Sequence, residues 1–423
     1  PNPWWYLAVW VGGGALALAG AMAYAELAAL RPRAGGEYVY LDAAYGRAAA
    51  FLTGWTSFVA GFTGAIASNA YFLTFYIDRF APGSANATPW FTIPLPFAPI
   101  TLSTQSAVAI VSVWLLAFIH LRGVGPGRVT MNILATLKVS ALLVFIAVGF
   151  AFGAGQWSNL GTSSGVTTPG NWLFAFIPVM LAYSGWNAAA YVAEEIRDPG
   201  RNVPKALAIG TVSVIAVYVL LNVLYLYVFS VGELAALEGN VLDVVAERLL
   251  GVNAGHIMGV VSIVSLMASN SAMTFAGPRV YFAMARDDAF FRAAARIHPA
   301  YKTPAAAIVA QTVWTTLLIL TGGAAALATN TGFAITLFAG VAVAALFVLR
   351  AREPERPRPF KALGYPVAPG IFVLASLLIV VNALWTDLVT PFTTGQPLGP
   401  SAAGLFIIAL GLPLYWWFSS KTA

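Results

Sequence analysis

Residues 180–207 read MLAYSGWNAAAYVAEEIRDPGRNVPKAL and interrupt a chain that is otherwise strongly apolar. Within them, Ser184-Gly185 is the point at which a helix opens at the lowest cost, since glycine lowers helix propensity by about 1 kcal/mol relative to alanine. In lipid, opened backbone persists only where it lines a cavity or is buried in protein. The stretch therefore predicts an interrupted helix whose free peptide groups bind the charged ends of a small zwitterion. The alternative is a continuous helix whose small residues allow close helix packing.

The composition predicts an integral membrane protein. Of 423 residues, 59% are hydrophobic and only 9% are charged, whereas soluble domains carry about 25% charged residues. We therefore expect the lipid bilayer to surround the chain. The sequence contains no cysteine, which excludes disulfides, thiolate metal sites and any disulfide-linked partner. The histidines His120, His256 and His298 are far apart in sequence, and we expect no metal, no other cofactor and no nucleic-acid partner.

Eleven segments are apolar over about 20 residues, the length that a helix needs to cross the hydrocarbon of a bilayer. They are 4–30, 48–77, 101–121, 129–152, 171–195, 204–229, 253–285, 304–322, 328–349, 366–387 and 401–419. The predicted fold class is therefore an all-α integral membrane protein that crosses the bilayer many times.

The positive charges alternate between the connections on the two sides of these spans. Connections 31–47, 121–128, 194–205, 286–303 and 350–363, together with the C-terminal tail, hold 18 of the 22 Lys and Arg residues. The connections on the other side hold only Arg79 and Arg248. By the positive-inside rule the first set is cytoplasmic. We therefore expect the first residue outside the cell and the C-terminus inside, with one further helix preceding Pro1.

Several strings make the chain recognisable. Residues 183–207 (YSGWNAAAYVAEEIRDPGRNVPKAL) resemble the sixth helix and following loop of the amino acid–polyamine–organocation (APC) transporters, especially the L-type amino acid transporter branch. Residues 10–46 (WVGGGALALAGAMAYAELAALRPRAGGEYVYLDAAYG) are similar to the second helix and first cytoplasmic loop of that family. Residues 274–304 resemble its eighth helix and the next loop, and residues 356–372 the loop that leads into its eleventh helix.

The resemblance implies one transporter domain over residues 1–423 with the LeuT-like APC fold, two inverted five-helix repeats followed by two helices. The eleven spans then correspond to family helices two to twelve. Residues 1–152 hold the rest of the first repeat, 171–349 the second repeat and 366–419 the two additional helices. The family's first helix, with its glycine-rich motif for the substrate carboxylate, has no counterpart in the sequence. The given chain is therefore expected not to transport by itself, whereas a parent protein with that helix should.

By the same resemblance, substrate binding is assigned to the interrupted helix. The assigned residues are Leu181, Ala182, Tyr183, Ser184, Gly185, Trp186 and Asn187. Leu181 stands where L-type relatives commonly have an aromatic gate, so a preference other than large neutral amino acids is expected. Trp186 is expected to serve packing, and Asn187 to hydrogen-bond the substrate or to steady the break.

Lys138 lies deep within the span 129–152. A lysine at mid-span costs about 3 kcal/mol unless it is paired or faces a polar cavity, and snorkelling to water is difficult from this depth. The resemblance places its ammonium where sodium-coupled relatives bind their ion, which implies sodium independence and a site for proton coupling. Its expected neighbours are Ser269 and Asn270, for which hydrogen bonding between helices is the alternative role.

The charges near the cytoplasmic ends of three spans predict an inner gate in which acidic and basic side chains form ion pairs. Its expected members are Glu26, Glu194, Glu195, Arg279 and Arg286. The basic, proline-rich loop 350–361 is expected to contact anionic lipid headgroups and to have no chemical role.

Together these features predict a secondary active transporter in a bacterial cytoplasmic membrane. We expect a permease or exchanger of neutral amino acids that is sodium-independent and works by alternating access. An integral-membrane enzyme would need converging acid–base or metal groups, and the spans contain too few ionisable residues to supply them. A polyamine or another cationic amine is the alternative substrate, but the outer halves of the spans lack the acidic side chains that would favour it.

Overall fold

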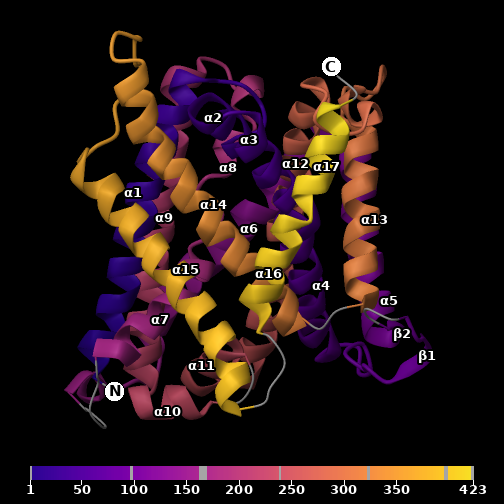
Figure 1. Cartoon of the computed structure of the whole chain (residues 1–423). Coiled ribbons are helices and arrows are strands. Elements are labelled where there is room, and N and C mark those ends of the chain that lie inside the picture. The colour runs from indigo at the N-terminus through magenta and orange to yellow at the C-terminus, as the bar shows by residue number, and fades with distance from the viewer. Residues whose placement is uncertain are drawn as a thin grey trace.

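The protein is a bundle of long helices that run between two opposite ends of the molecule (Figure 1). The computed structural model describes residues 2–95, 99–161, 169–237, 240–321, 324–394 and 399–420. Within these ranges, nine helical segments are long and apolar enough to cross a membrane. The prediction of an all-α protein that crosses the bilayer many times is therefore confirmed.

The nine segments contain α1 (Pro3–Leu30), α3 (Arg47–Thr56) with η1 (Ser57–Gly61) and α4 (Phe62–Asp78), α5 (Thr104–Leu121), α6 (Val124–Phe152), α9 (Pro199–Val228), α12 (Val252–Arg286), α14 (Ala324–Arg352), α15 (Val367–Thr394), and α16 (Pro400–Ala409) with α17 (Gly411–Ser419). The two remaining predicted spans are α13 (Ala305–Thr321), which is shorter, and a helix in two parts, α7 (Pro169–Ala182) and α8 (Ala188–Tyr191). The beginning of α1 and the end of α17 lie at opposite ends of the bundle (Figure 1).

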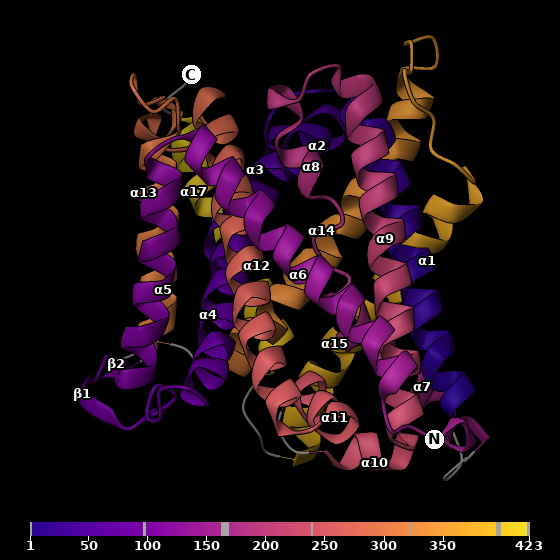
Figure 2. The ribbon, with the colours of Figure 1, turned by 180° about the vertical axis from the view of Figure 1, so that it is seen from behind.

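Short elements lie at the two ends of the bundle (Figures 1 and 2). The arginine-rich end holds α2 (Glu37–Tyr45), η3 (Ala193–Glu195) and η4 (Arg292–Ala295). The other end holds α10 (Val231–Ala236), α11 (Val241–Leu250), η2 (Trp157–Gly161) and the antiparallel strands β1 (Pro89–Ile93) and β2 (Ile100–Ser103). The hairpin was not predicted, because strands of five and four residues give too short an alternation to stand out beside the apolar spans.

The second span contains one π-helical turn, η1, between α3 and α4. Such a turn frees backbone carbonyls that a regular helix would satisfy, and these need other partners within a membrane. Side chains from three different helices donate to them. Tyr281 Oη of α12 donates to the carbonyl of Ser57 at 3.1 Å, Trp314 Nε1 of α13 to Val59 at 3.0 Å and Thr331 Oγ1 of α14 to Ala60 at 2.8 Å.

The largest buried cluster lies at the arginine-rich end, where the second half of α1 meets α2, α8, α12 and α14. Small residues on α1 bring its neighbours close. A Cβ atom at Gly14 would lie 2.8 Å from the side chain of Ile215 on α9, and one at Gly20 would lie 2.8 Å from the ring of Trp186. This packing holds α1 and α9 side by side and fixes α1 against the residues that follow α7.

Candidate functional site

The predicted interruption at Ser184-Gly185 is present in the structure. α7 ends at Ala182, α8 begins at Ala188, and residues 183–187 form turns. Gly185 has φ +94°, a conformation that residues with a Cβ rarely adopt. Among the described residues, no hydrogen bond is made by the backbone N–H groups of Gly185 and Trp186. The continuous helix that was the alternative is therefore wrong, and the break leaves these two peptide donors available.

The opened segment borders a small cavity of about 30 Å³. Ser184, Gly185, Trp186 and Asn187 line it from the break, and residues of α1, α14 and α15 complete its wall. The cavity has room for a water-sized molecule and not for an amino acid. The polar side chains that line it, Ser184, Asn187, Thr336 and Ser376, are all uncharged.

The other residues assigned to substrate binding do not line this cavity. Leu181 is 40% exposed, and Ala182 accepts a hydrogen bond at its carbonyl from Tyr218 Oη at 3.0 Å. Tyr183 is buried, and its hydroxyl donates to the carbonyl of Trp10 on α1 at 3.0 Å. Tyr183 therefore connects the end of α7 with α1, Ala182 connects it with α9, and Leu181 lies on the surface. A direct contact of these residues with substrate remains a prediction.

Trp186 has the packing role that was expected. Its ring makes edge-on contacts with Tyr24 at a centroid distance of 4.9 Å and with Phe372 at 5.7 Å. The indole therefore packs between α1 and α15, next to the break. Asn187 is 8% exposed and follows it at the start of α8.

Lys138 is half-buried on α6, and no hydrogen bond or ion pair joins its ammonium to any described residue. Asn270 on α12 is fully buried, and neither its Oδ1 nor its Nδ2 has a partner in the described part of the chain. Ser271 bonds instead to His120 Nε2 at 2.9 Å. Buried amides usually have a hydrogen-bond partner in the protein or in ordered water. The expected contact of Lys138 with Ser269 and Asn270 remains a prediction.

Two predicted ion pairs of the inner gate are formed at the arginine-rich end. Arg279 Nε donates to Glu195 at 2.9 Å, and Arg286 Nη1 donates to Glu194 at 2.9 Å. The backbone N–H of Ala34 also donates to Glu194, at 2.9 Å. The hydrogen bond from Arg286 is the main reason why the pKa of Glu194 lies below its ordinary value. These pairs join the segment after the break to the end of α12.

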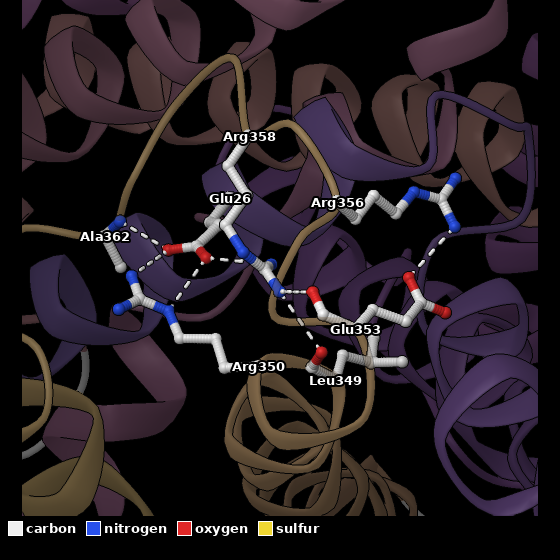
Figure 3. Close-up of polar contacts among 7 residues, drawn as sticks. All are labelled: Glu26, Leu349, Arg350, Glu353, Arg356, Arg358 and Ala362. Carbon is white, nitrogen blue, oxygen red and sulfur yellow. Dashed lines mark hydrogen bonds and ion pairs between the residues drawn. The ribbon is translucent and has the colours of Figure 1, made fainter.

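Glu26 is not a member of that group, and the prediction that it pairs there is wrong (Figure 3). Its carboxylate is fully buried and accepts from Arg350 Nε at 2.9 Å, from Arg358 Nη1 at 3.2 Å and from the N–H of Ala362 at 2.6 Å. The loop 350–361 therefore has a structural role that was not predicted, because two of its arginines neutralise a buried carboxylate. Glu26 faces α14 rather than α12, and residues 324 positions apart gave no signal of that contact in the sequence.

A second buried carboxylate, Glu37, was missed by the sequence analysis. Tyr24 Oη donates to its Oε1 at 2.7 Å, and Tyr191 Oη donates to its Oε2 at 2.8 Å. Asn187 Nδ2 donates to Oε1 at 3.0 Å, so Glu37 contacts the interrupted helix directly. Burial raises the pKa of Glu37 above its ordinary value. The only sequence signal was an acidic residue between two glycines and a tyrosine (GGEY, 35–38), which is typical of a loop.

The opposite end of the bundle holds a further charged cluster that was not predicted. Arg79, at the end of α4, lies 3.6 Å from Asp243 and 3.5 Å from Glu247, both on α11. Its Nε also donates to His256 Nδ1 on α12 at 2.9 Å. This cluster ties the short helix α11 to two long helices.

Comparison with known proteins agrees with this architecture. The amino acid permease family matches residues 1–411 of the chain. The large neutral amino acids transporter small subunit 2 of Homo sapiens is 31% identical over 97% of this chain and 72% of its own length. The serine/threonine exchanger SteT of Bacillus subtilis (strain 168) is 26% identical over 99% of this chain and 89% of its own length. The human cystine/glutamate transporter is 29% identical over 97% of this chain and 77% of its own length.

Proposed function

Because the chain belongs to the amino acid permease family, we propose that it moves neutral amino acids across a lipid bilayer as a sodium-independent permease or exchanger. The family and the named relatives are amino acid transporters rather than enzymes. The relatives differ in the amino acids for which they are named, so the choice of neutral substrates depends on this chain's own residues.

The observation that carries the proposal is the interruption of the fifth span beside a cavity. The N–H groups of Gly185 and Trp186, which have no partner among the described residues, suit a carboxylate, and they lie at the break that borders the cavity. Carbonyl groups of opened backbone suit an ammonium. An amino acid carries both groups on one carbon, so one break in one helix can bind its whole charged part.

The uncharged lining of the cavity supports a neutral substrate. A polyamine carries only positive charges, which favour carboxylates, and no acidic side chain lines the cavity in the described part of the chain. A cationic amine therefore remains the less favoured candidate. Leu181 is aliphatic, so we propose a side-chain preference that differs from relatives with an aromatic residue there.

Lys138 supports independence from sodium. A fixed ammonium at mid-span supplies the positive charge that a bound metal ion would supply elsewhere, and Asn270 on the neighbouring helix α12 has no partner among the described residues. We propose that Lys138, Ser269 and Asn270 act together in the conformational cycle. We also propose that the arginine-rich end faces the cytoplasm of a bacterium. The same proposal divides the chain into two repeats followed by two further helices.

The ion pairs at the arginine-rich end support alternating access. Glu194 and Glu195 follow the broken helix, whereas Arg279 and Arg286 belong to α12, so opening this end requires both pairs to separate. A transporter that works by alternating access passes through a conformation with a closed inner end and a small cavity.

Uptake by the purified full-length protein in proteoliposomes tests the proposal. Radiolabelled serine, threonine, leucine, glutamate and putrescine would be offered with and without sodium, with a pH gradient, and with unlabelled amino acid inside the vesicles. We expect uptake of neutral amino acids that is indifferent to sodium, and stimulation by internal amino acid if the protein exchanges. Uptake of putrescine alone would overturn the choice of substrate, and a strict need for sodium would overturn the role of Lys138.

A further inference from the structure

Glu37 is a carboxyl group held entirely by neutral donors. Tyr24 comes from α1, Tyr191 from α8, and Asn187 from the last position of the break, and all three donate to it within 3.0 Å. The side chain is 7% exposed. In the described part of the chain no arginine, lysine or histidine forms an ion pair with it, unlike Glu26, Glu194 or Glu195.

The basic side chains on the elements packed around Glu37 bind other groups. Arg33 in the preceding loop pairs with an aspartate, and Arg279 on α12 pairs with a glutamate. On α14, Arg350 binds Glu26 and Arg352 donates to a backbone carbonyl. The titratable groups that face Glu37 are therefore three phenols, those of Tyr24, Tyr191 and, from its own helix, Tyr40.

Two backbone contacts hold this arrangement in place. The N–H of Gly35 donates to the carbonyl of Tyr191 at 3.1 Å. A Cβ atom at Gly36 would lie 2.5 Å from the ring of Tyr191, so only glycine lets the loop pass so close. The loop before α2 therefore packs directly against the segment after the break. The backbone of Glu37 cannot move away from Tyr191 without moving that segment.

The donors are complementary to an ionised carboxylate. Asn187 Nδ2 uses both of its hydrogens, one for Glu37 Oε1 and the other for Tyr191 Oη at 3.0 Å. A proton on Glu37 turns one carboxyl oxygen into a donor, and only a phenol can accept it, because an amide N–H₂ group cannot. The accepting phenol must then turn its own hydrogen away. The bond from Asn187 also weakens, since it is no longer assisted by a negative charge.

From this geometry we infer that Glu37 is a proton-binding site, and that the proton releases the Asn187 side chain towards the cavity beside the break. The ionised form holds the amide against Glu37 and Tyr191, and the protonated form lets it reach a substrate. Burial without a cation raises the pKa of Glu37, which favours the proton. The link to substrate rests on the proposed function, whereas the proton site itself does not.

Infrared difference spectroscopy tests the proton site without any substrate. The C=O stretching band of a protonated carboxylic acid is separate from the bands of a carboxylate. We expect such a band in the wild-type protein at low pH, its loss as the pH rises, and its absence from Glu37→Gln. Glu355→Gln removes an exposed carboxyl group and should leave the band unchanged. A band that persists unaltered in folded Glu37→Gln would overturn the inference.

The pH dependence of transport tests the coupling. With radiolabelled leucine and threonine as probes, wild-type uptake should fall by up to about tenfold per pH unit above the pKa of Glu37, the limit for one proton. In Glu37→Gln, which mimics the protonated form, uptake should be independent of pH at the upper level. A Glu37→Gln profile that still follows the wild type would overturn the coupling.

The variant Tyr191→Phe tests whether Tyr191 positions the Glu37 carboxyl group or only supports the structure. Losing a donor to the ionised form should move the midpoint of the pH profile upwards, whereas loss of structure would lower uptake equally at every pH. This variant also serves if Glu37→Gln fails to fold. If the wild type moves none of the probes at any pH, the proposed function fails, and the infrared experiment still decides whether Glu37 holds a proton.

Discussion

Arg279 Nε lies 2.9 Å from a carboxylate oxygen of Glu195, and this contact joins α12 to the segment that follows the broken helix. Arg279 is 3% exposed whereas Glu195 is 39% exposed, so the pair lies at the border between the bundle interior and solvent. Because water reaches one partner, this pair can separate at a lower cost than a fully buried pair.

Loss of this pair should open the inner end. The chain contains no cysteine, so Ala193→Cys supplies a single buried reporter next to the gate. In this background Glu195→Gln should raise the rate of labelling by a membrane-impermeant thiol reagent several-fold, because Arg279 no longer holds the segment. Arg292→Ala breaks only an exposed pair with Asp288 and serves as the control. Equal labelling rates in all three proteins would contradict a gate at Glu195.

The break should not tolerate a side chain at its glycine. Gly185→Ala places a Cβ at φ +94°, which we expect to cost about 1–2 kcal/mol and to distort the donors at the break. Gly210→Ala is the matched control, since this helical glycine on α9 has open space around it and should stabilise the helix by up to about 1 kcal/mol. Thermal unfolding in detergent and uptake in vesicles would measure both. Normal uptake by Gly185→Ala would show that the glycine conformation is dispensable.

Removal of the charge at Glu26 should destabilise the protein strongly. Glu26→Gln leaves Arg350 and Arg358 without their anion, and breaking a buried pair in this way costs about 3 kcal/mol or more. Glu355→Gln, on the same loop but exposed, should be neutral. The melting temperatures of the two variants would be compared, and we expect that of Glu26→Gln to be lower. Equal values would mean that solvent or another anion replaces the carboxylate.

Lys138→Ala should abolish most transport without unfolding the bundle. The ammonium forms no ion pair in the described structure, so its removal leaves no buried carboxylate unpaired. We expect an unchanged or raised melting temperature together with a large loss of uptake. Normal uptake kinetics in this variant would exclude a role for the lysine in the cycle.

The Glu194–Arg286 pair should make part of the stability depend on acid. The folded protein lowers the pKa of Glu194, so this contribution is present above the ordinary value of 4.5 and disappears as the pH falls through the lower, folded value. Wild type should therefore lose more thermal stability than Glu194→Gln between neutral pH and the acid range. Parallel stability profiles for the two proteins would show that the pair contributes nothing.

The helices, the break and two gate pairs could be predicted because each leaves a local signal. Apolar length marks a span, and Ser184-Gly185 within such a run marks an opening. Glu195 and Arg279 lie near the arginine-rich ends of two predicted spans, which is enough to expect opposite charges to meet. Glu26 also lies near the arginine-rich end of its span, and its partner could not be predicted because several basic loops lie at that same end.

The Glu37 group could not be predicted for a different reason. Its members come from a span, a loop helix and the far side of the break, and hydrogen bonds between neutral groups leave no pattern of charge in a sequence. The π-helical turn at Ser57–Gly61 was missed as well, because its stability depends on donors from three helices that follow much later in the chain.

That turn has a mechanical consequence. Tyr281, Trp314 and Thr331 each donate to a carbonyl of the same five residues, in surroundings that offer no replacement for a lost hydrogen bond. The three helices that carry them cannot slide past η1 without breaking these hydrogen bonds. We therefore expect α12, α13 and α14 to move together with η1 as one unit.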